Sequence, residues 1–171
     1  TEVLMQASSP YFDRQGTAFC SHMYTPSSKG GYHSCVVRNG KVVVFAHRLF
    51  TEYYTYAPKW CKLMMRDVLG LLLGKPLLTH NGPSTLRLSL LEQPEKSRYT
   101  LHLLTYIPVR KCKSFDIIEE STPVDQLDVI VNLPKRIQSA RLVPENISLT
   151  IRDGVLHIDH LDGYGIVELN Y

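Results

Sequence analysis

The chain has 171 residues, of which 44% are hydrophobic and 20% are charged, and its net charge is +3 at pH 7. This length suits one large domain or two small ones, and the composition is ordinary for a globular protein. The longest apolar run, residues 68–73 with Gly70 inside it, is far shorter than a transmembrane helix, and the weak, scattered positive charge argues against nucleic acid. Neither a membrane nor a nucleic acid is therefore an expected partner.

The chain begins with Thr1 rather than methionine, and no signal peptide or targeting segment follows it. The first recognisable elements read like the middle of a fold, whereas residues 165–171 read like a true end. We therefore expect the chain to be the C-terminal piece of a longer protein.

Residues 35–38 and 42–45 are β-branched runs on either side of Asn39-Gly40. Asn-Gly suits the two positive φ values of a type I′ turn, so the pattern predicts a β-hairpin. Upstream of it, residues 8–31 are rich in Ser, Pro, Gly and Tyr. They are predicted to form a long ordered loop that serves a function or contacts a partner.

A helix is predicted over residues 58–73, with Pro58 at its first position, Gly74 as its C-terminal cap and Pro76 preventing continuation. Its apolar residues share one helical face. They are Trp60, Leu63, Met64, Val68, Leu71 and Leu72. Strands followed by a helix indicate a sheet with a helix on its face.

The composition changes near residue 82, after a predicted linker at residues 79–83. Beyond it, apolar and polar residues alternate in about seven short segments, which is typical of a small antiparallel β-sandwich or barrel. These segments are 86–90, 99–103, 127–133, 140–143, 148–151, 155–158 and 166–171. Asp153-Gly154 predicts a second tight turn.

The four cysteines are Cys20, Cys35, Cys61 and Cys112, at irregular spacing. A chain of this size does not need a disulfide framework, so we expect reduced, structural thiols and favour the bacterial cytoplasm over the periplasm. No cofactor is expected.

Cys20-Ser21-His22 and His33-Ser34-Cys35 form a mirrored pair of zinc-type ligands, namely Cys20, His22, His33 and Cys35. Each pair has a single intervening residue, which is fewer than usual in zinc sites. The alternative reading is buried thiols and hydrogen-bonded histidines, and no metal is assigned. A small metal- or thiol-dependent hydrolase that uses these residues stays open as an alternative. In the thiol-dependent case His22 or His47 would be the base of Cys20, although no nucleophile elbow is present.

Glu52 adjoins Tyr53, Tyr54 and Tyr56, and aromatic residues beside a carboxylate suit either a sugar or a wet protein interface. We take Tyr24 together with these four as candidate interface or sugar-contact residues. No pair of carboxylates is nominated for glycoside hydrolysis, so no catalytic residue is assigned. A free-standing carbohydrate-binding module is the second alternative.

Several short phrases occur together, although each is unspecific by itself. They are Pro10-Tyr11-Phe12-Asp13-Arg14, Cys20-Ser21-His22, Thr25-Pro26, Val37-Arg38-Asn39-Gly40, Phe45-Ala46-His47, Ala57-Pro58-Lys59-Trp60-Cys61, Asn81-Gly82-Pro83-Ser84-Thr85, Tyr99-Thr100-Leu101-His102-Leu103-Leu104 and Ile107-Pro108. This combination, which covers nearly the whole chain, resembles the C-terminal region of bacterial β-galactosidase-like glycoside hydrolases related to family 42.

The resemblance implies that residues 1–82 are the end of an α/β trimerisation domain of the flavodoxin or glutamine-amidotransferase type. Residues 83–171 would be the terminal antiparallel β-sandwich, so the expected fold class is α/β plus all-β. It further implies a non-catalytic role in structure and subunit assembly. The implied partners are other subunits of a homo-oligomer, a trimer in the parent enzyme, an upstream (β/α)8 barrel that carries the catalytic glutamates, and a carbohydrate.

Overall fold

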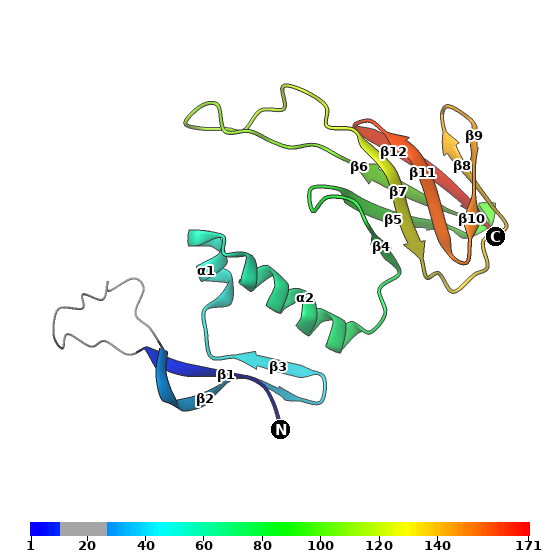
Figure 1. Ribbon diagram of the computed structural model, residues 1–171. Coiled ribbons are helices and arrows are strands. Elements are labelled where there is room, and N and C mark those ends of the chain that lie inside the picture. The colour runs from blue at the N-terminus through cyan, green and yellow to red at the C-terminus, as the bar shows by residue number, and fades with distance from the viewer. Residues whose placement is uncertain (11–26) are drawn as a thin grey trace. The chain divides into compact units, whose positions relative to one another are not determined.

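The computed structural model describes residues 1–10 and 27–171, and its contacts divide the chain into two compact units (Figure 1). Unit 1 is Thr1–Gly74 and unit 2 is Lys75–Tyr171. The predicted linker belongs to unit 2, because Leu78–His80 forms strand β4 and pairs with β7 in an antiparallel ladder. The division therefore falls earlier than the expected boundary between residues 82 and 83.

Unit 1 contains a three-stranded antiparallel sheet in the order β1-β2-β3, formed by Glu2–Pro10, Ser27–Asn39 and Val42–Phe45. The predicted hairpin is confirmed, but Asn39 pairs with Val42 and the two-residue loop is Gly40-Lys41. Only Gly40 of these two has a positive φ, of 58°. Glycine at the first loop position is typical of a type II′ turn rather than the expected type I′ turn.

Two helices follow the sheet, α1 at Leu49–Tyr56 and α2 at Lys59–Leu73. The predicted helix is confirmed as α2, with Pro58 at the N-cap, and Gly74 ends it with a φ of 74° and an N–H bonded to the Gly70 carbonyl. Helix α1 was not predicted. Ala57, at a left-handed φ of 48°, separates the two helices.

The apolar face predicted for α2 is only partly covered within unit 1. Val68 is buried at 6% exposure, but Trp60, Leu63 and Leu71 remain 48%, 37% and 47% exposed. Helical periodicity therefore identified the face correctly, but unit 1 alone does not bury it.

The expected flavodoxin-type segment is wrong. A doubly wound sheet has parallel strands with a helix in each crossover. Among the described residues of unit 1 every strand pair is antiparallel, and α1 and α2 come after β3. The end of β1, residues 8–10, and the beginning of β2, residues 27–31, lie where we expected a loop; the rest of the predicted loop, residues 11–26, lies outside the described residues.

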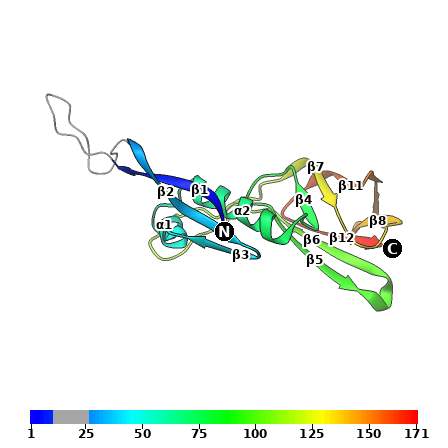
Figure 2. The same cartoon turned by 90° about the horizontal axis from the view of Figure 1, so that it is seen from below.

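Unit 2 is an antiparallel β-sandwich, as the alternating pattern predicted. One sheet has the order β10-β11-β7-β4 and the other β5-β6-β12-β8-β9. Figure 2 shows β4, β7 and β11 in one layer and β5, β6 and β12 in the other. The strands are β4 Leu78–His80, β5 Arg87–Gln93, β6 Arg98–Leu104, β7 Val124–Val131, β8 Ser139–Val143, β9 Ile147–Leu149, β10 Ile151–Arg152, β11 Val155–Leu161 and β12 Tyr164–Asn170, with a 3-10 turn at Pro94–Lys96.

The core of the sandwich comes from residues that alternate along its central strands, facing inward from both sheets. Its buried members are Leu86, Tyr99, Leu101, Leu103, Leu127, Val129, Ala140, Leu156, Ile158, Leu161, Val167 and Leu169. The Asp153-Gly154 turn is confirmed between β10 and β11, where φ is 50° and 79°, as a type I′ turn requires. No helix in the described part of the chain is long and apolar enough to span a membrane.

Candidate functional site

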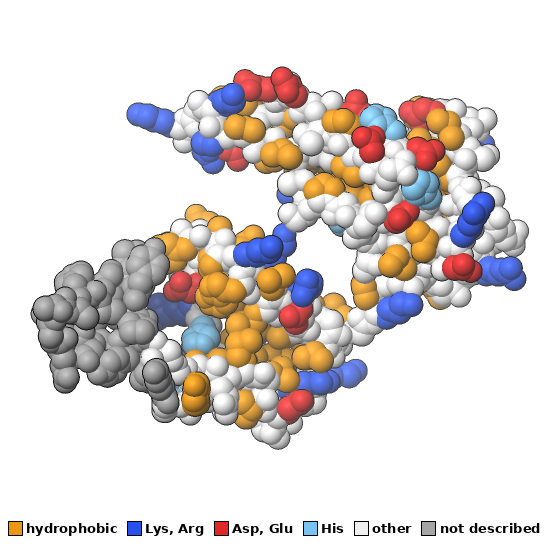
Figure 3. Space-filling view, viewed as in Figure 1, with side chains coloured by type: hydrophobic (Ala, Val, Ile, Leu, Met, Phe, Trp, Pro, Cys, Tyr) orange, Lys and Arg blue, Asp and Glu red, His pale blue; other side chains and the backbone are white. Residues whose placement is uncertain are grey.

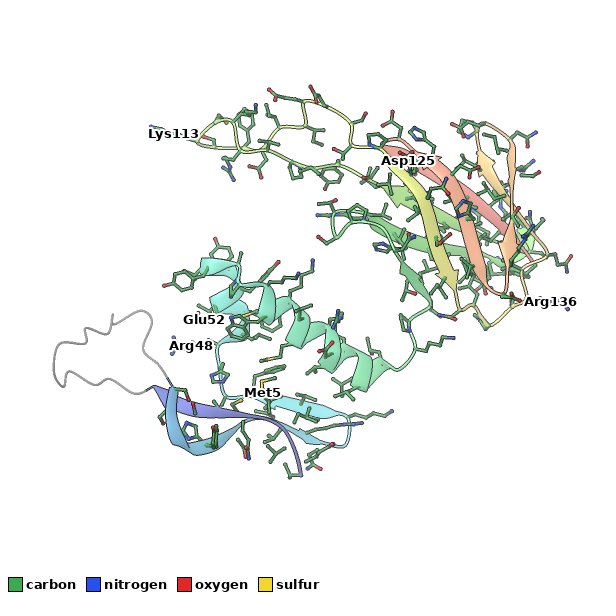
Figure 4. The ribbon with its side chains drawn as sticks, in the orientation of Figure 1. Met5, Arg48, Glu52, Lys113, Asp125 and Arg136 are labelled. Atoms are coloured by element: carbon green, nitrogen blue, oxygen red, sulfur yellow. The ribbon has the colours of Figure 1, made fainter. Side chains whose placement is uncertain are left out.

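A pocket of about 660 Å³ lies in unit 1 between strand β1, the segment that follows β3, and helices α1 and α2. Figure 4 labels Met5 on β1, Arg48 just before α1 and Glu52 within α1, which belong to its wall. The pocket is lined by Met5, Gln6, Ala7, Cys35, Ala46, His47, Arg48, Glu52, Trp60 and Met64. We call it the unit 1 pocket.

Helical spacing places the pocket's side chains. Arg48 and Glu52 are one turn apart at the beginning of α1, and the Glu52 N–H donates to the Arg48 carbonyl at 2.9 Å. Trp60 and Met64 are one turn apart on α2, so each pair presents neighbouring side chains on one face. Apolar atoms dominate the wall, and a few polar groups converge on it, which is the usual composition of small-molecule sites.

The two charged groups of the pocket have opposite sign and do not neutralise each other directly. Among the described residues, no ion pair or side-chain hydrogen bond joins Arg48 or Glu52 to a protein group. Burial raises the pKa of the neighbouring Cys61 thiol, and the negative charge of Glu52 raises it further. Because neither side chain is paired with a protein group among the described residues, the Arg48 guanidinium and the Glu52 carboxylate are available to a ligand.

Glu52 is the one predicted contact residue that lines this pocket. Tyr53, Tyr54 and Tyr56 also lie on α1, but they face solvent at 43%, 93% and 71% exposure. Tyr24 lies outside the described residues. The role of the tyrosines in an interface or in sugar contact stays a prediction.

Of the zinc-type ligands, Cys20 and His22 lie outside the described residues. His33 is exposed on β2, whereas Cys35 is buried at 3% exposure and lines the pocket. Within residues 1–10 and 27–171, no group of three or more His, Cys, Asp or Glu side chains is arranged to hold a metal ion. Cys35 and Cys61 are buried free thiols, as expected, and Cys112 is an exposed one.

Sequence reasoning missed Gln6, His47 and Arg48 as members of the pocket, and assigned Trp60 to a buried helix face. Gln6 lies on β1, and His47 and Arg48 lie between β3 and α1. The sequence predicted neither β1 nor α1, so it gave no reason to place these residues together. The spacing of Arg48 and Glu52, four residues apart, was the available signal, because it places both on one face of a helix.

A second feature of unit 1 is its exposed apolar surface. Within its described residues, the buried apolar side chains are Cys35, Val36, Leu49, Cys61 and Val68. Figure 3 shows hydrophobic side chains gathered on the visible face of this unit. The exposed ones are Val3, Met5, Tyr32, Val42, Val44, Phe50, Tyr53, Tyr54, Tyr56, Trp60, Leu63, Leu69, Leu71 and Leu73. Exposed apolar patches of this kind mark interaction surfaces.

The sheet contributes an apolar stripe to this surface. Val3 pairs with Val37, and Val37 pairs with Val44, so the three side chains lie on one face across three strands. Val3 and Val44 are 48% and 56% exposed. Strand β3 is also an edge strand made of Val, Val, Val and Phe, and such apolar edges are normally covered by another part of a protein.

The sandwich carries its polar clusters on the outward faces of its sheets. Glu168 is buried at 9% exposure and binds the guanidinium groups of Arg98 and Arg141. A hollow of about 400 Å³ near residues 131–137 includes Lys135 and Arg136, the latter labelled in Figure 4. Lys135 already donates to Glu92 at 2.8 Å and to the Tyr171 hydroxyl at 2.7 Å, so its ammonium group is engaged.

Two histidine–aspartate pairs join β7 and β11. His157 lies 2.7 Å from Asp128, and His160 lies 2.6 Å from Asp125. The hydrogen bond to Asp128 is the largest cause that raises the pKa of His157, and the bond to Asp125 does the same for His160. Both pairs are solvent-accessible, so they tune the stability of the sandwich modestly.

We expect unit 2 to lose a modest part of its stability as pH rises. A histidine whose pKa is raised on folding stabilises the fold fully below its unfolded pKa of about 6.5, and this contribution is lost as pH rises through the higher folded value. Urea midpoints between about pH 5.5 and about pH 8 measure it. Asp128→Asn should flatten the profile, whereas Asp116→Asn, whose carboxylate pairs with Arg110, should not. Parallel profiles for wild type and Asp128→Asn would contradict the assignment.

The described residues therefore form a unit of two helices with an antiparallel sheet and a second unit that is an antiparallel β-sandwich. The chain superposes on the α-L-fucosidase isoenzyme 2 from Paenibacillus thiaminolyticus with a TM-score of 0.82 and 28% sequence identity. The match covers 96% of this chain and 26% of that chain, so the chain spans about a quarter of the length of that solved structure. No family profile and no curated protein sequence matches the chain. In fold and sequence, the chain is similar to part of a glycoside hydrolase.

Proposed function

We propose that this chain is a non-catalytic portion of a glycoside hydrolase, with a role in structure and assembly. The observation that carries the proposal is the similarity over 96% of the chain to a quarter of an α-L-fucosidase. The parent enzyme would hydrolyse glycosidic bonds in carbohydrate metabolism. The solved relative favours a parent enzyme that is closer to α-L-fucosidases than to β-galactosidase-like enzymes of family 42.

The surface of unit 1 supports a role in assembly. A unit of this size is marginal even with a complete core, and here most large apolar side chains of α1 and α2 remain exposed. Burying apolar area is worth roughly 25 cal/mol per Å², so covering the Val3–Val37–Val44 stripe and the outward side of α2 would stabilise unit 1 substantially. The proposed occupant is the catalytic module of the parent enzyme, together with neighbouring subunits.

The proposal is tested by assaying the purified 171-residue chain with 4-nitrophenyl α-L-fucoside and 4-nitrophenyl β-D-galactoside. We expect no turnover above the rate without protein, because the lining of the unit 1 pocket has one carboxylate, that of Glu52, whereas glycoside hydrolysis uses two. Turnover by the chain that is abolished in Glu52→Gln would contradict a non-catalytic role, since it would place a catalytic carboxylate in the unit 1 pocket.

A further inference from the structure

The unit 1 pocket has the chemistry of a binding site for a neutral sugar, and we infer that it binds a pyranose directly. This inference differs from the assembly role, because it concerns the ligand of the unit 1 pocket, which shares only Met5 and Trp60 with the exposed apolar surface. The pocket holds one aromatic wall, one carboxylate, one guanidinium, an imidazole and a primary amide, contributed by Trp60, Glu52, Arg48, His47 and Gln6.

The size of the pocket fits a ligand of this class. Its volume of about 660 Å³ lies within the 300–1,000 Å³ typical of small-molecule sites. Residues of β1, β2, the segment after β3, α1 and α2 form it, so its shape follows from the sheet and the helix pair rather than from a single loop. Met5 comes from β1, Glu52 from α1 and Met64 from α2 (Figure 4).

The charges of the pocket suit a ligand without net charge. Its lining has one carboxylate and one guanidinium, which are opposite in sign. An anion would be attracted by Arg48 and repelled by Glu52, and a cation the reverse, whereas a polyol can accept from the guanidinium and donate to the carboxylate. Hydrogen bonds to charged groups are the stronger ones, so Glu52 and Arg48 would supply orientation and most of the polar affinity.

The aromatic wall provides the apolar half of the recognition. Trp60 is 48% exposed, although it lies on the apolar face of α2. An indole ring offers a flat, electron-rich face to the C–H groups on one side of a pyranose, and its N–H stays available for a hydrogen bond. Met5 and Met64 add adaptable apolar contacts beside it.

The chain contains a single tryptophan, so its fluorescence reports on this pocket alone. The full 171-residue chain is titrated with L-fucose and, separately, with D-galactose, and N-acetyltryptophanamide corrects for effects of the sugar on free indole. We expect a saturable change in Trp60 emission with at least one of the two sugars. A strictly linear response, equal to that of the free indole for both sugars, would overturn the inference.

Two variants that retain Trp60 locate the sugar. Glu52→Gln keeps the shape but removes the charge, and we expect it to weaken the apparent affinity about tenfold or more. Glu95→Gln, an exposed glutamate on the 3-10 turn of unit 2, is the matched control and should leave the affinity unchanged. Circular dichroism confirms that both variants remain folded.

Tyr54→Ala separates the pocket from the exposed tyrosines of α1. It should not change the affinity, because Tyr54 is 93% exposed and does not line the pocket. If Tyr54→Ala weakens binding and Glu52→Gln does not, the sugar sits on the tyrosine surface and the inference is wrong. Saturable binding without any turnover would support the pocket while leaving the non-catalytic role intact, so the two proposals can fail independently.

Discussion

Replacing Leu101 by alanine is expected to lower the free energy of unfolding of unit 2 by about 3 kcal/mol. Leu101 is fully buried at the centre of β6, where it pairs with Leu90 on one side and Val167 on the other. Truncation removes buried apolar atoms and leaves a cavity, because both neighbouring strands are held by continuous hydrogen-bond ladders and cannot close the gap. Urea denaturation followed by far-UV circular dichroism measures the loss.

Leu91→Ala is the matched control for this variant. Leu91 lies on the neighbouring strand β5, but its side chain is 55% exposed, so its truncation should cost less than about 1 kcal/mol. Equal losses for the two variants would show that the inward and outward faces of this sheet have been assigned incorrectly.

Glu168→Gln should destabilise unit 2 by about 2 kcal/mol at neutral pH. Glu168 lies on β12 between β6 and β8, and its two carboxylate oxygens bind Arg98 and Arg141 separately. The variant leaves two guanidinium groups facing a neutral amide. Because Arg141 is 45% exposed, water compensates part of this loss, which keeps the expected value below that of a fully buried ion pair.

The pH dependence of this variant provides a second check. The hydrogen bond from Arg141, followed by the charge of Arg98, lowers the pKa of Glu168 below the ordinary carboxyl value. Its contribution is therefore present above the unfolded pKa and is lost as pH falls through the folded pKa. The difference between wild type and Glu168→Gln should vanish in acid. Glu145→Gln, an exposed glutamate without an ion pair among the described residues, should show no such difference at any pH.

The sandwich was predictable because most of its strands carry their own alternating pattern, whereas the short strand β4 overlaps the predicted linker and was not expected. Leu101 and Leu103 alternate with polar residues, and the Asp153-Gly154 turn has the two positive φ values that its sequence indicates. Unit 1 was not predictable in the same way. The residues of β1 and early β2 have weak strand propensity, and they form a sheet because they pair with each other across a long sequence separation.

The pocket could not be predicted from the sequence for a similar reason. Glu52 stood out from its sequence neighbours, but the residues that make it part of a pocket do not adjoin it in the sequence. Gln6 and Cys35 reach it through the pairing of β1 with β2, and Trp60 through the turn at Ala57. The resemblance to a glycoside hydrolase is supported by the solved fucosidase, whereas the flavodoxin-type sheet that it implied was replaced by three antiparallel strands.

The most direct test of whether this chain is a portion of a glycoside hydrolase is to precipitate the polypeptide from the cells that produce it, using an antibody raised against the 171-residue chain. We expect a band tens of kilodaltons larger than 19.5 kDa, in a precipitate that hydrolyses 4-nitrophenyl α-L-fucoside or β-D-galactoside while the purified chain does not. A band at 19.5 kDa, in a precipitate without glycosidase activity, would contradict the proposal that this chain is a non-catalytic portion of a glycoside hydrolase.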